Sequence, residues 1–389
     1  MSQSTAFFEL PHMAERSTEP ASARCRAELA TSIAGLEQDW CALEQSVPDA
    51  AVFQCWAWCK AWLDASASVG LAENVRIVLV RHRGRLGLLW PLAVRRTCSS
   101  HILHALAEPA TQYCGALVDP EQDAGKLFTA AWTLIRSWKD IDLVELRRVR
   151  QDSPLQALPP IAANKSITFN NDAAPFIDTS LASACAHRSS RTRNALRRHR
   201  RKLEAHGPLT FEVLDAPILK LHALKEALTL KRKWLQERGK WSGGYAHPAA
   251  DAFSSPLTSC REYVVARLRV GEATAAVEAG FVTHGRYWSL TQSYDSRFAS
   301  HAPGRLLMDY FIDHCARTGI GTIDLLAPAH PHKRQWSTGE VAVRDHHLPL
   351  SVKGHLVAAF LRRGRPGLKN FARFLPAPAR LRVLRAIKW

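Results

Sequence analysis

The sequence of 389 residues lacks any long uninterrupted apolar run. Its longest candidate, LGLLWPLAV at 86–94, is broken by Pro91 and falls short of the roughly 18 residues that a membrane span needs. The first residues also lack the basic segment followed by an apolar segment that marks a secretion signal, so we expect a flexible leader at 1–28. The sequence therefore predicts a cytoplasmic protein, either free or peripheral at the inner membrane face.

Closely spaced cysteine pairs are also missing. The nine cysteines are odd in number and scattered, and none forms the CxxC spacing of zinc or redox sites. Cys55 and Cys59 lie one helical turn apart in FQCWAWCKAWL, but the tryptophans around them favour core packing over metal binding. We therefore expect reduced, mostly buried cysteines and no metal.

Acidic residues are absent from two stretches. Residues 188–202 hold eight Lys or Arg and 346–389 hold ten, with no Asp or Glu in either, so the formal charge of +17 belongs to these segments. Such runs favour a polyanion, whether nucleic acid such as tRNA, a phosphorylated sugar carrier or anionic lipid. The tail at 349–389 also mixes Phe, Leu and Trp389 with its basic residues, which suits an anionic membrane surface. The motifs of sequence-specific nucleic-acid binding are not found.

Two long stretches repeat one order of elements. Each has two apolar strand-like segments around a hairpin glycine, Gly84 or Gly271, then an amphipathic helix, then a strand containing Asp-Leu. A helix is predicted before each repeat, at 50–66 and 217–238. Antiparallel strands followed by a crossover helix and another strand predict an α/β fold with two related domains, each a mixed, largely antiparallel sheet flanked by helices.

The repeat predicts how the chain divides. We expect an N-terminal domain at 29–153, a linker with one short strand, ITF, at 154–177, a C-terminal domain at 178–348 and a basic tail at 349–389.

The segment ASHAPGRLL at 299–307 predicts an unusual helix start. Helices usually begin with a Ser, Thr, Asp or Asn cap and acidic residues just inside, because the unpaired amides there are electropositive. Here Gly304 allows backbone to approach a ligand, and Arg305 adds positive charge. This arrangement favours phosphate, although an ordinary loop-to-helix junction would have the same letters.

The motifs around this helix start resemble those of GNAT-fold acyltransferases. YDSRFASHAPGRLLMDYFI and IDLLAPAHPHKRQW are similar to elements of the FemABX-like, CelD/BcsL-type acetyltransferases, a group linked to polysaccharide and cell-envelope work. The resemblance implies two tandem GNAT-like domains and acetyl-CoA or another acyl-CoA as co-substrate. Two departures from the family pattern are His332, where the family has tyrosine, and a Pro-rich APAHP in the preceding loop.

The resemblance also implies roles for individual residues. Lys333 would stabilise the developing oxyanion or orient the acceptor, with a solvated loop lysine as the alternative. Asp295 and Glu278 are both candidates for the general base and are not ranked. Tyr294 and Trp336 would shape the acceptor pocket. The phosphate cradle would be formed by His301, Ala302, Pro303, Gly304 and Arg305.

The leading hypothesis is an acyl-CoA-dependent N- or O-acyltransferase acting on a cell-envelope, polysaccharide-related or small amine or hydroxyl acceptor. One alternative keeps the fold and takes its donor from aminoacyl-tRNA, as Fem-type aminoacyltransferases do, with the basic segments on RNA phosphates. Another is a non-catalytic binder of nucleic acid or anionic membrane.

Overall fold

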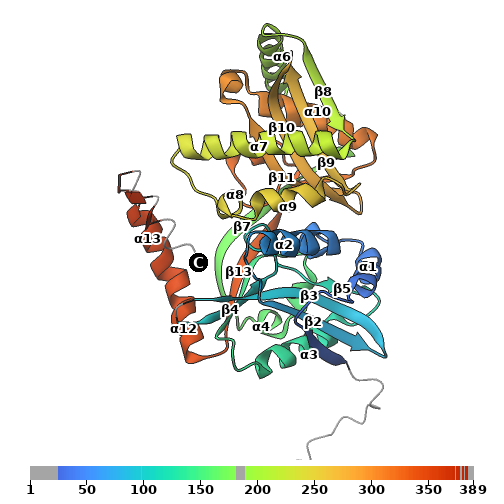
Figure 1. Ribbon diagram of the computed structural model, residues 1–389, viewed down its shortest axis with the longest axis vertical. Coiled ribbons are helices and arrows are strands. Elements are labelled where there is room, and N and C mark those ends of the chain that lie inside the picture. The colour runs from blue at the N-terminus through green and yellow to red at the C-terminus, as the bar shows by residue number, and fades with distance from the viewer. Residues whose placement is uncertain are drawn as a thin grey trace, which may run out of the picture.

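The computed structural model describes residues 25–97, 99–180, 189–372, 374–376, 379–380 and 382–383. One sheet of thirteen strands runs through the whole molecule, in the order β1-β2-β3-β4-β6-β13-β7-β12-β11-β10-β9-β8, with β5 beside β3. Figure 1 shows the two ends of this sheet as two lobes stacked along the long axis. Most of the expected leader at 1–28 lies outside the described residues.

The first lobe contains the first repeat. Its hairpin turns at Gly84, whose φ of 80° is a backbone conformation that glycine adopts easily. β4 and β6 pair in parallel because the crossover helix α3 joins them, and α3 and α2 cover opposite faces of the sheet. The elements are β1 Arg26–Ala30, α1 Glu37–Ser46, η2 Val52–Gln54, α2 Trp56–Ser68, β2 Val75–His82, β3 Arg85–Arg96, β4 His101–Ala105, β5 Leu117–Val118, α3 Ala124–Ser137 and β6 Leu143–Arg150.

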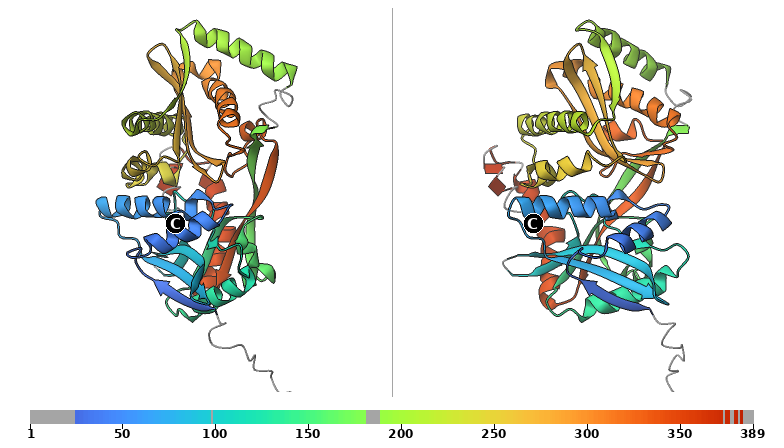
Figure 2. Two further views of the ribbon diagram at one scale, coloured as in Figure 1. Left: turned by 90° about the vertical axis from the view of Figure 1, so that its right-hand side faces the viewer. Right: turned by 45° about the vertical axis from the view of Figure 1, so that its right-hand side comes forward.

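The second lobe repeats this plan. Its hairpin turns at Gly271, with a φ of 55°, and β11 and β12 pair in parallel across the crossover helix α10. Figure 2 shows α7 and α10 on opposite faces of the sheet. The elements are α6 Ser190–Glu204, β8 Leu209–Leu214, α7 Pro217–Glu237, α8 Gly243–Ala246, α9 Ala250–Leu257, β9 Tyr263–Val270, β10 Ala273–Thr283, β11 Arg286–Tyr294, η4 Ser296–His301, α10 Pro303–Arg317 and β12 Thr322–Asp324. The predicted α/β class, with its repeated, largely antiparallel units, is confirmed.

Two strands join the lobes. β7, Ile167–Asp178, pairs with β12 of the second lobe, and β13, Gly339–Pro349, pairs with both β7 and β6 of the first lobe. The sequence predicts a linker with one short strand at 154–177, but the structure has a strand of twelve residues there. The exposed NND within it breaks the polar and apolar alternation that would have marked its full length. The rest of the predicted linker forms η3 Pro154–Ala157 and α4 Pro159–Ala162.

The predicted basic tail is largely helical where it is described. α12 Val352–Ala359, the π-helical η5 Phe360–Gly364 and α13 Arg365–Ala372 form one continuous helix, which projects at the edge of the first lobe (Figure 1). In the part of the chain that the structure describes, no helix is long and apolar enough to cross a membrane.

The tryptophan-rich helix α2 packs between the lobes. Trp58 and Trp62 contact Phe253 of α9 edge-on, with ring centroids 4.8 and 5.4 Å apart. Cys55 and Cys59 are buried beside them and carry no disulfide, as expected for core packing. One apolar core therefore runs across the lobe junction.

Candidate active site

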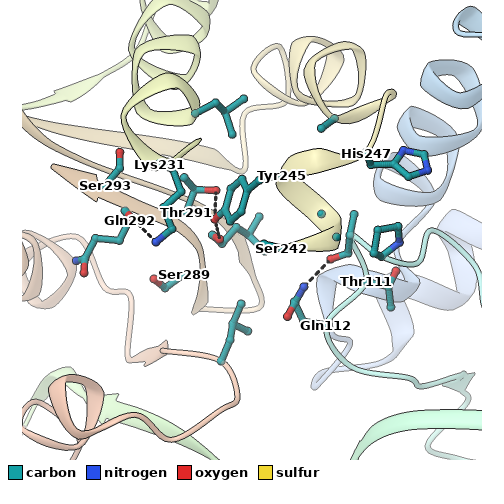
Figure 3. Close-up of a pocket in the computed structure, with 18 of the residues that line it drawn as sticks. Thr111, Gln112, Lys231, Ser242, Tyr245, His247, Ser289, Thr291, Gln292 and Ser293 are labelled. Atoms are coloured by element: carbon teal, nitrogen blue, oxygen red, sulfur yellow. Dashed lines mark hydrogen bonds between the residues drawn. The ribbon is translucent and has the colours of Figure 1, made fainter. Parts of the chain in front are cut away.

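A cleft of about 1520 Å³ lies between the two lobes. The first lobe contributes α2, the loop at 107–112 and the end of β6, and the second contributes α7, α8, β11, the start of α10 and residues 325–336. Figure 3 shows Thr111 and Gln112 of the first lobe on one side, with Lys231 and Tyr245 of the second on the other. Neither lobe alone forms this cleft.

The start of α10 is part of the cleft wall. Ala302 has a left-handed φ of 50° and gives the helix no side-chain cap, and Pro303 occupies the first turn. A Cβ added to Gly304 would lie 3.7 Å from Cδ1 of Tyr294, so this glycine leaves the backbone open on its cleft side. Residues 302–305 all line the cleft. Ala302 N donates to Ala299 O and Arg305 N donates to Ala302 O, and Pro303 has no N–H. The amide of Gly304 and the dipole of this first turn therefore face a space large enough for a ligand.

The equivalent helix of the first lobe has a different start. In α3, Ala124 and Gly125 stand where α10 has Pro303 and Gly304, but the side chain of Asp123 accepts a hydrogen bond from Lys126 N at 3.1 Å. This carboxylate caps the helix and places a negative charge where an anion would bind. Of the two repeated helix starts, only that of α10 is free of such a cap and opens on the cleft.

Only some of the predicted cradle residues line the cleft in the structure. His301 does not line the cleft, and its Nε2 lies 3.2 Å from Nε2 of His206. Arg305 does line it, and its Nε is buried with no hydrogen-bond partner among the described residues. Of the five predicted cradle residues, residues 302–305 therefore line the cleft and His301 does not.

Lys333 lies on the short helix α11, Pro331–Arg334, and lines the cleft. Its Nζ donates a hydrogen bond to Leu326 O at 2.7 Å. Burial, together with the nearby Arg148, lowers the pKa of Lys333 from 10.5 to about 8. The ammonium is therefore held by a backbone carbonyl inside the cleft and is largely protonated at neutral pH.

The two predicted base candidates have different surroundings. Glu278 is completely buried on β10, and this burial raises its pKa to about 7 although Ser289 and Tyr287 donate hydrogen bonds to it. For Asp295 burial acts in the same direction, but bonds from Arg297 outweigh it and the pKa of Asp295 is lowered. A carboxylate paired with a guanidinium holds protons poorly, so of the two residues Glu278 has the pKa closer to that of a general base.

Glu278 does not itself line the cleft, but Ser289 does. Ser289 Oγ donates to Glu278 Oε1 at 2.5 Å, and it thus links the buried carboxyl to the cleft surface. Tyr294 and Trp336 both line the cleft, and Tyr294 OH accepts a hydrogen bond from Trp234 Nε1 at 3.2 Å.

Two cations that line the cleft could not be recognised as site residues from the sequence. Lys231 of α7 donates to Gln292 O at 2.9 Å, and burial lowers its pKa. Arg148 has a left-handed φ of 50°, and its guanidinium donates to Gln112 rather than to a carboxylate. Burial and the neighbouring Arg147 lower the pKa of Arg148. Both residues look like ordinary helix or strand residues in the sequence, because only the opposite lobe places them in a cleft.

A known protein family matches the second lobe, which forms much of the cleft. Residues 190–334 match the family model of the acetyltransferase (GNAT) domain. The match spans α6 to α11, Pro331–Arg334, and includes α10 and most of the second-lobe residues that line the cleft. The narrower CelD/BcsL resemblance is not part of this finding. No curated protein matches the sequence.

Solved structures share the fold over most of the chain. The C-terminal domain of a putative lysylphosphatidylglycerol synthetase from Agrobacterium fabrum superposes with a TM-score of 0.53 at 13% identity, over 85% of this chain and 95% of that one. FemX superposes with a TM-score of 0.55 at 12% identity, over 81% of this chain and 96% of its own. At these identities the likeness shows the fold alone.

Proposed function

We propose that the protein is an acyl-CoA-dependent acyltransferase that transfers an acyl group, by preference acetyl, to an amine or hydroxyl acceptor in the cleft between its lobes. One observation carries this proposal. The uncapped start of α10 lines the same cleft as Lys333, within the segment that matches the GNAT domain. An anion-binding helix start and a buried cation facing one cavity are the parts that a phosphate-bearing thioester donor needs.

In this proposal the backbone of residues 302–305 and the side chain of Arg305 hold the pyrophosphate of the donor. The acceptor nitrogen or oxygen attacks the thioester carbonyl, whose oxygen gains negative charge that the ammonium of Lys333 stabilises. Collapse of the tetrahedral intermediate breaks the C–S bond and releases the CoA thiolate, which takes up a proton. The acceptor loses its proton to a base.

We assign the base to Glu278, acting through the hydroxyl of Ser289. A pKa of about 7 leaves this carboxyl close to half ionised at neutral pH, the condition under which a general base works best. Ser289 would pass the acceptor's proton to Glu278 and remain neutral. Asp295, held by Arg297, would instead fix the loop that leads into α10.

The cations that line the cleft indicate the chemistry of the acceptor. The side chains of Arg148 and Lys231 line the cleft, and no carboxylate of the described residues is bonded to either of them. This favours an acceptor that carries a carboxylate or phosphate. A cell-envelope or polysaccharide precursor fits this chemistry. Tyr294 and Trp336 would pack against its apolar parts.

An aminoacyl-tRNA donor is the second candidate, and the position of α6 favours it. This basic helix packs beside α10, and His199 on it lies close enough to Arg305 for the positive charge there to contribute to lowering the pKa of His199. Arg197, Arg198 and Arg201 are exposed on its outer side. An RNA phosphate backbone would fit that surface next to the donor site.

Native mass spectrometry of the purified protein tests the two donors against each other. Acetyl-CoA, longer acyl-CoAs and tRNA are offered in turn, and we expect a one-to-one complex with an acyl-CoA. Saturable binding of tRNA with no CoA complex would contradict the acyl-CoA donor and would support the aminoacyl-tRNA donor.

A further inference from the structure

Large apolar side chains are exposed together on the C-terminal helix. Most of the exposed large hydrophobic residues of the described chain fall in this one segment, and the others are Val69, Leu71, Ile218 and Leu219. On the helix they are Val352, Leu356, Phe360, Leu368 and Phe371, with Phe374 just beyond its end. Val352 is 80% exposed and Phe374 is 87% exposed, so this surface is open.

These residues share one face of the helix. Val352, Leu356 and Phe360 recur every four residues, the spacing that aligns side chains along one side. The opposite side holds the buried residues Gly354, Ala358 and Leu361. Ala358 and Leu361 pack on Ile102 of β4 and Leu143 of β6. The apolar face is therefore turned outward by a helix that is already anchored on its other side.

Contacts between α12 and the first lobe keep the apolar face of the helix turned outward. The side chain of Ser351 caps α12 by accepting from Gly354 N at 3.1 Å, and its hydroxyl donates to Asp142 Oδ1 at 2.6 Å. A Cβ on Gly354 would lie 1.8 Å from Asp142 O, so the helix backbone lies directly against the first lobe. Rotating the helix to bury Phe360 would require breaking this close packing.

Basic side chains flank the apolar face. Lys353, Arg362 and Arg363 are exposed, and within the described residues no ion pair joins them to a carboxylate. From residue 346 onward the sequence contains no acidic residue. An outward apolar stripe bordered by cations is the composition of helices that lie in the plane of a membrane surface.

We infer that this surface, defined by Val352, Leu356, Phe360 and Phe371 with Lys353, Arg362 and Arg363, docks the protein on an anionic lipid membrane. The apolar side chains enter the boundary between headgroups and acyl chains, and the cations contact lipid phosphates. The other basic helix, α6, has charge but no exposed large apolar side chain, and it lies at the far end of the molecule (Figure 1). The docking surface is therefore the C-terminal helix alone.

Docking would also place the cleft next to the membrane. Arg365, on the inner side of the same helix, lines the cleft, so one helix has lipid on one face and the candidate active site on the other. The inference itself does not depend on the proposed chemistry, because vesicle binding is measured without turnover.

Flotation with vesicles tests the inference on the full chain. Vesicles of phosphatidylcholine alone are compared with vesicles that contain phosphatidylcholine and phosphatidylglycerol in equal parts. We expect binding to the mixed vesicles only. The variant Leu356→Ser, Phe360→Ser, Phe371→Ser should bind them at least about tenfold more weakly. Lys353→Gln, Arg362→Gln, Arg363→Gln should weaken binding by about fivefold for each charge removed.

Two matched controls keep the test specific. Ile218→Ser, Leu219→Ser removes exposed apolar side chains from α7, and replacement of Arg197, Arg198, Arg200 and Arg201 by Gln removes charge from α6. Both should bind vesicles like the wild type, and circular dichroism should show that all variants are folded. Equal loss in a control and in a C-terminal variant would overturn the inference. A lipid-independent dimer that the triple Ser variant abolishes would also overturn it, and would assign the face to a second copy of the chain.

Discussion

At the scale of single residues, burial shifts the pKa of Glu278 and the pKa of Lys333 in opposite directions. Glu278 is buried without a cation bonded to it, and this raises its pKa, whereas burial near Arg148 lowers the pKa of Lys333. Each shift moves the group toward neutral pH, where proton transfer is efficient. The shifted pKa of Glu278 predicts how the unfolding free energy depends on pH, and the shifted pKa of Lys333 predicts how turnover depends on pH.

The stability prediction concerns Glu278. Its pKa of about 7 in the folded protein lies above the 4.5 of an unperturbed glutamate, so the folded state keeps a proton that the unfolded state releases. The stabilisation is complete below pH 4.5 and is lost as the pH rises to about 7. Relative to Glu278→Gln, the wild type should lose up to about 1.4 kcal/mol of unfolding free energy per pH unit in this window.

Urea unfolding at several pH values checks the difference. The control Glu272→Gln changes a fully exposed glutamate and should follow the wild type at every pH. Parallel curves for the wild type and Glu278→Gln would contradict the assignment of a shifted carboxyl at this position.

The rate prediction concerns Lys333. Its ammonium must be protonated to stabilise the oxyanion, so turnover should fall as the pH rises through about 8. Lys333→Ala should lower kcat/KM by about 10²-fold or more while costing little stability, because the side chain of Lys333 makes one hydrogen bond, to Leu326 O. Steady-state kinetics over pH measures both, and Lys333→Arg should recover part of the rate. Wild-type rates in the Ala variant would remove Lys333 from the mechanism.

At the scale of elements, the sequence predicted what depends on local patterns. Alternation and glycine position located the two hairpins, and apolar periodicity located α3, α7 and α10. The Pro-Gly start of α10 was recognised because it lacks the usual cap. The exchange of β7 and β13 between lobes was not predicted, because pairing between distant strands leaves no local signal. Arg148 and Lys231 became site candidates only when the opposite lobe enclosed them.

The basic helix α6 gives a prediction at this scale. Its outward arginines do not line the cleft, so neutralising Arg197, Arg198, Arg200 and Arg201 should leave acetyl-CoA binding within about twofold of the wild type. If tRNA binds there instead, the slope of log affinity against log salt should fall by roughly 0.7 to 0.9 for each phosphate that the helix no longer neutralises. Filter binding with tRNA at several salt concentrations, beside calorimetry with acetyl-CoA, distinguishes the two donors.

At the scale of the whole molecule, one buried ion pair ties the lobes together. Asp324 of the second lobe is fully buried, pairs with Arg150 of the first lobe at 2.5 Å and accepts from Tyr113 OH at 3.0 Å. The walls of the cleft depend on this junction. The Asp-Leu motif of β12 therefore has a structural role, since its aspartate holds the lobes together.

Removing one partner of this pair should be costly. Arg150→Met leaves the carboxylate of Asp324 buried without its main partner, and we expect a loss of about 3–5 kcal/mol in unfolding free energy. Arg76→Met breaks a partly exposed pair with Asp140 and should cost less than about 1 kcal/mol. Urea denaturation of the two variants compares them directly, and equal losses would show that the junction does not depend on the buried pair.

The central claim is that the start of α10 holds the phosphates of an acyl-CoA in the cleft, and calorimetric titration with acetyl-CoA tests it most directly. Gly304→Val places a branched side chain where backbone must approach the pyrophosphate, and we expect affinity to fall by about tenfold or more while the fold stays cooperative. Gly125→Val makes the same change at the equivalent position of α3, whose start is capped by Asp123, and should leave affinity unchanged. Equal affinity of wild type and Gly304→Val, both folded, would contradict the account.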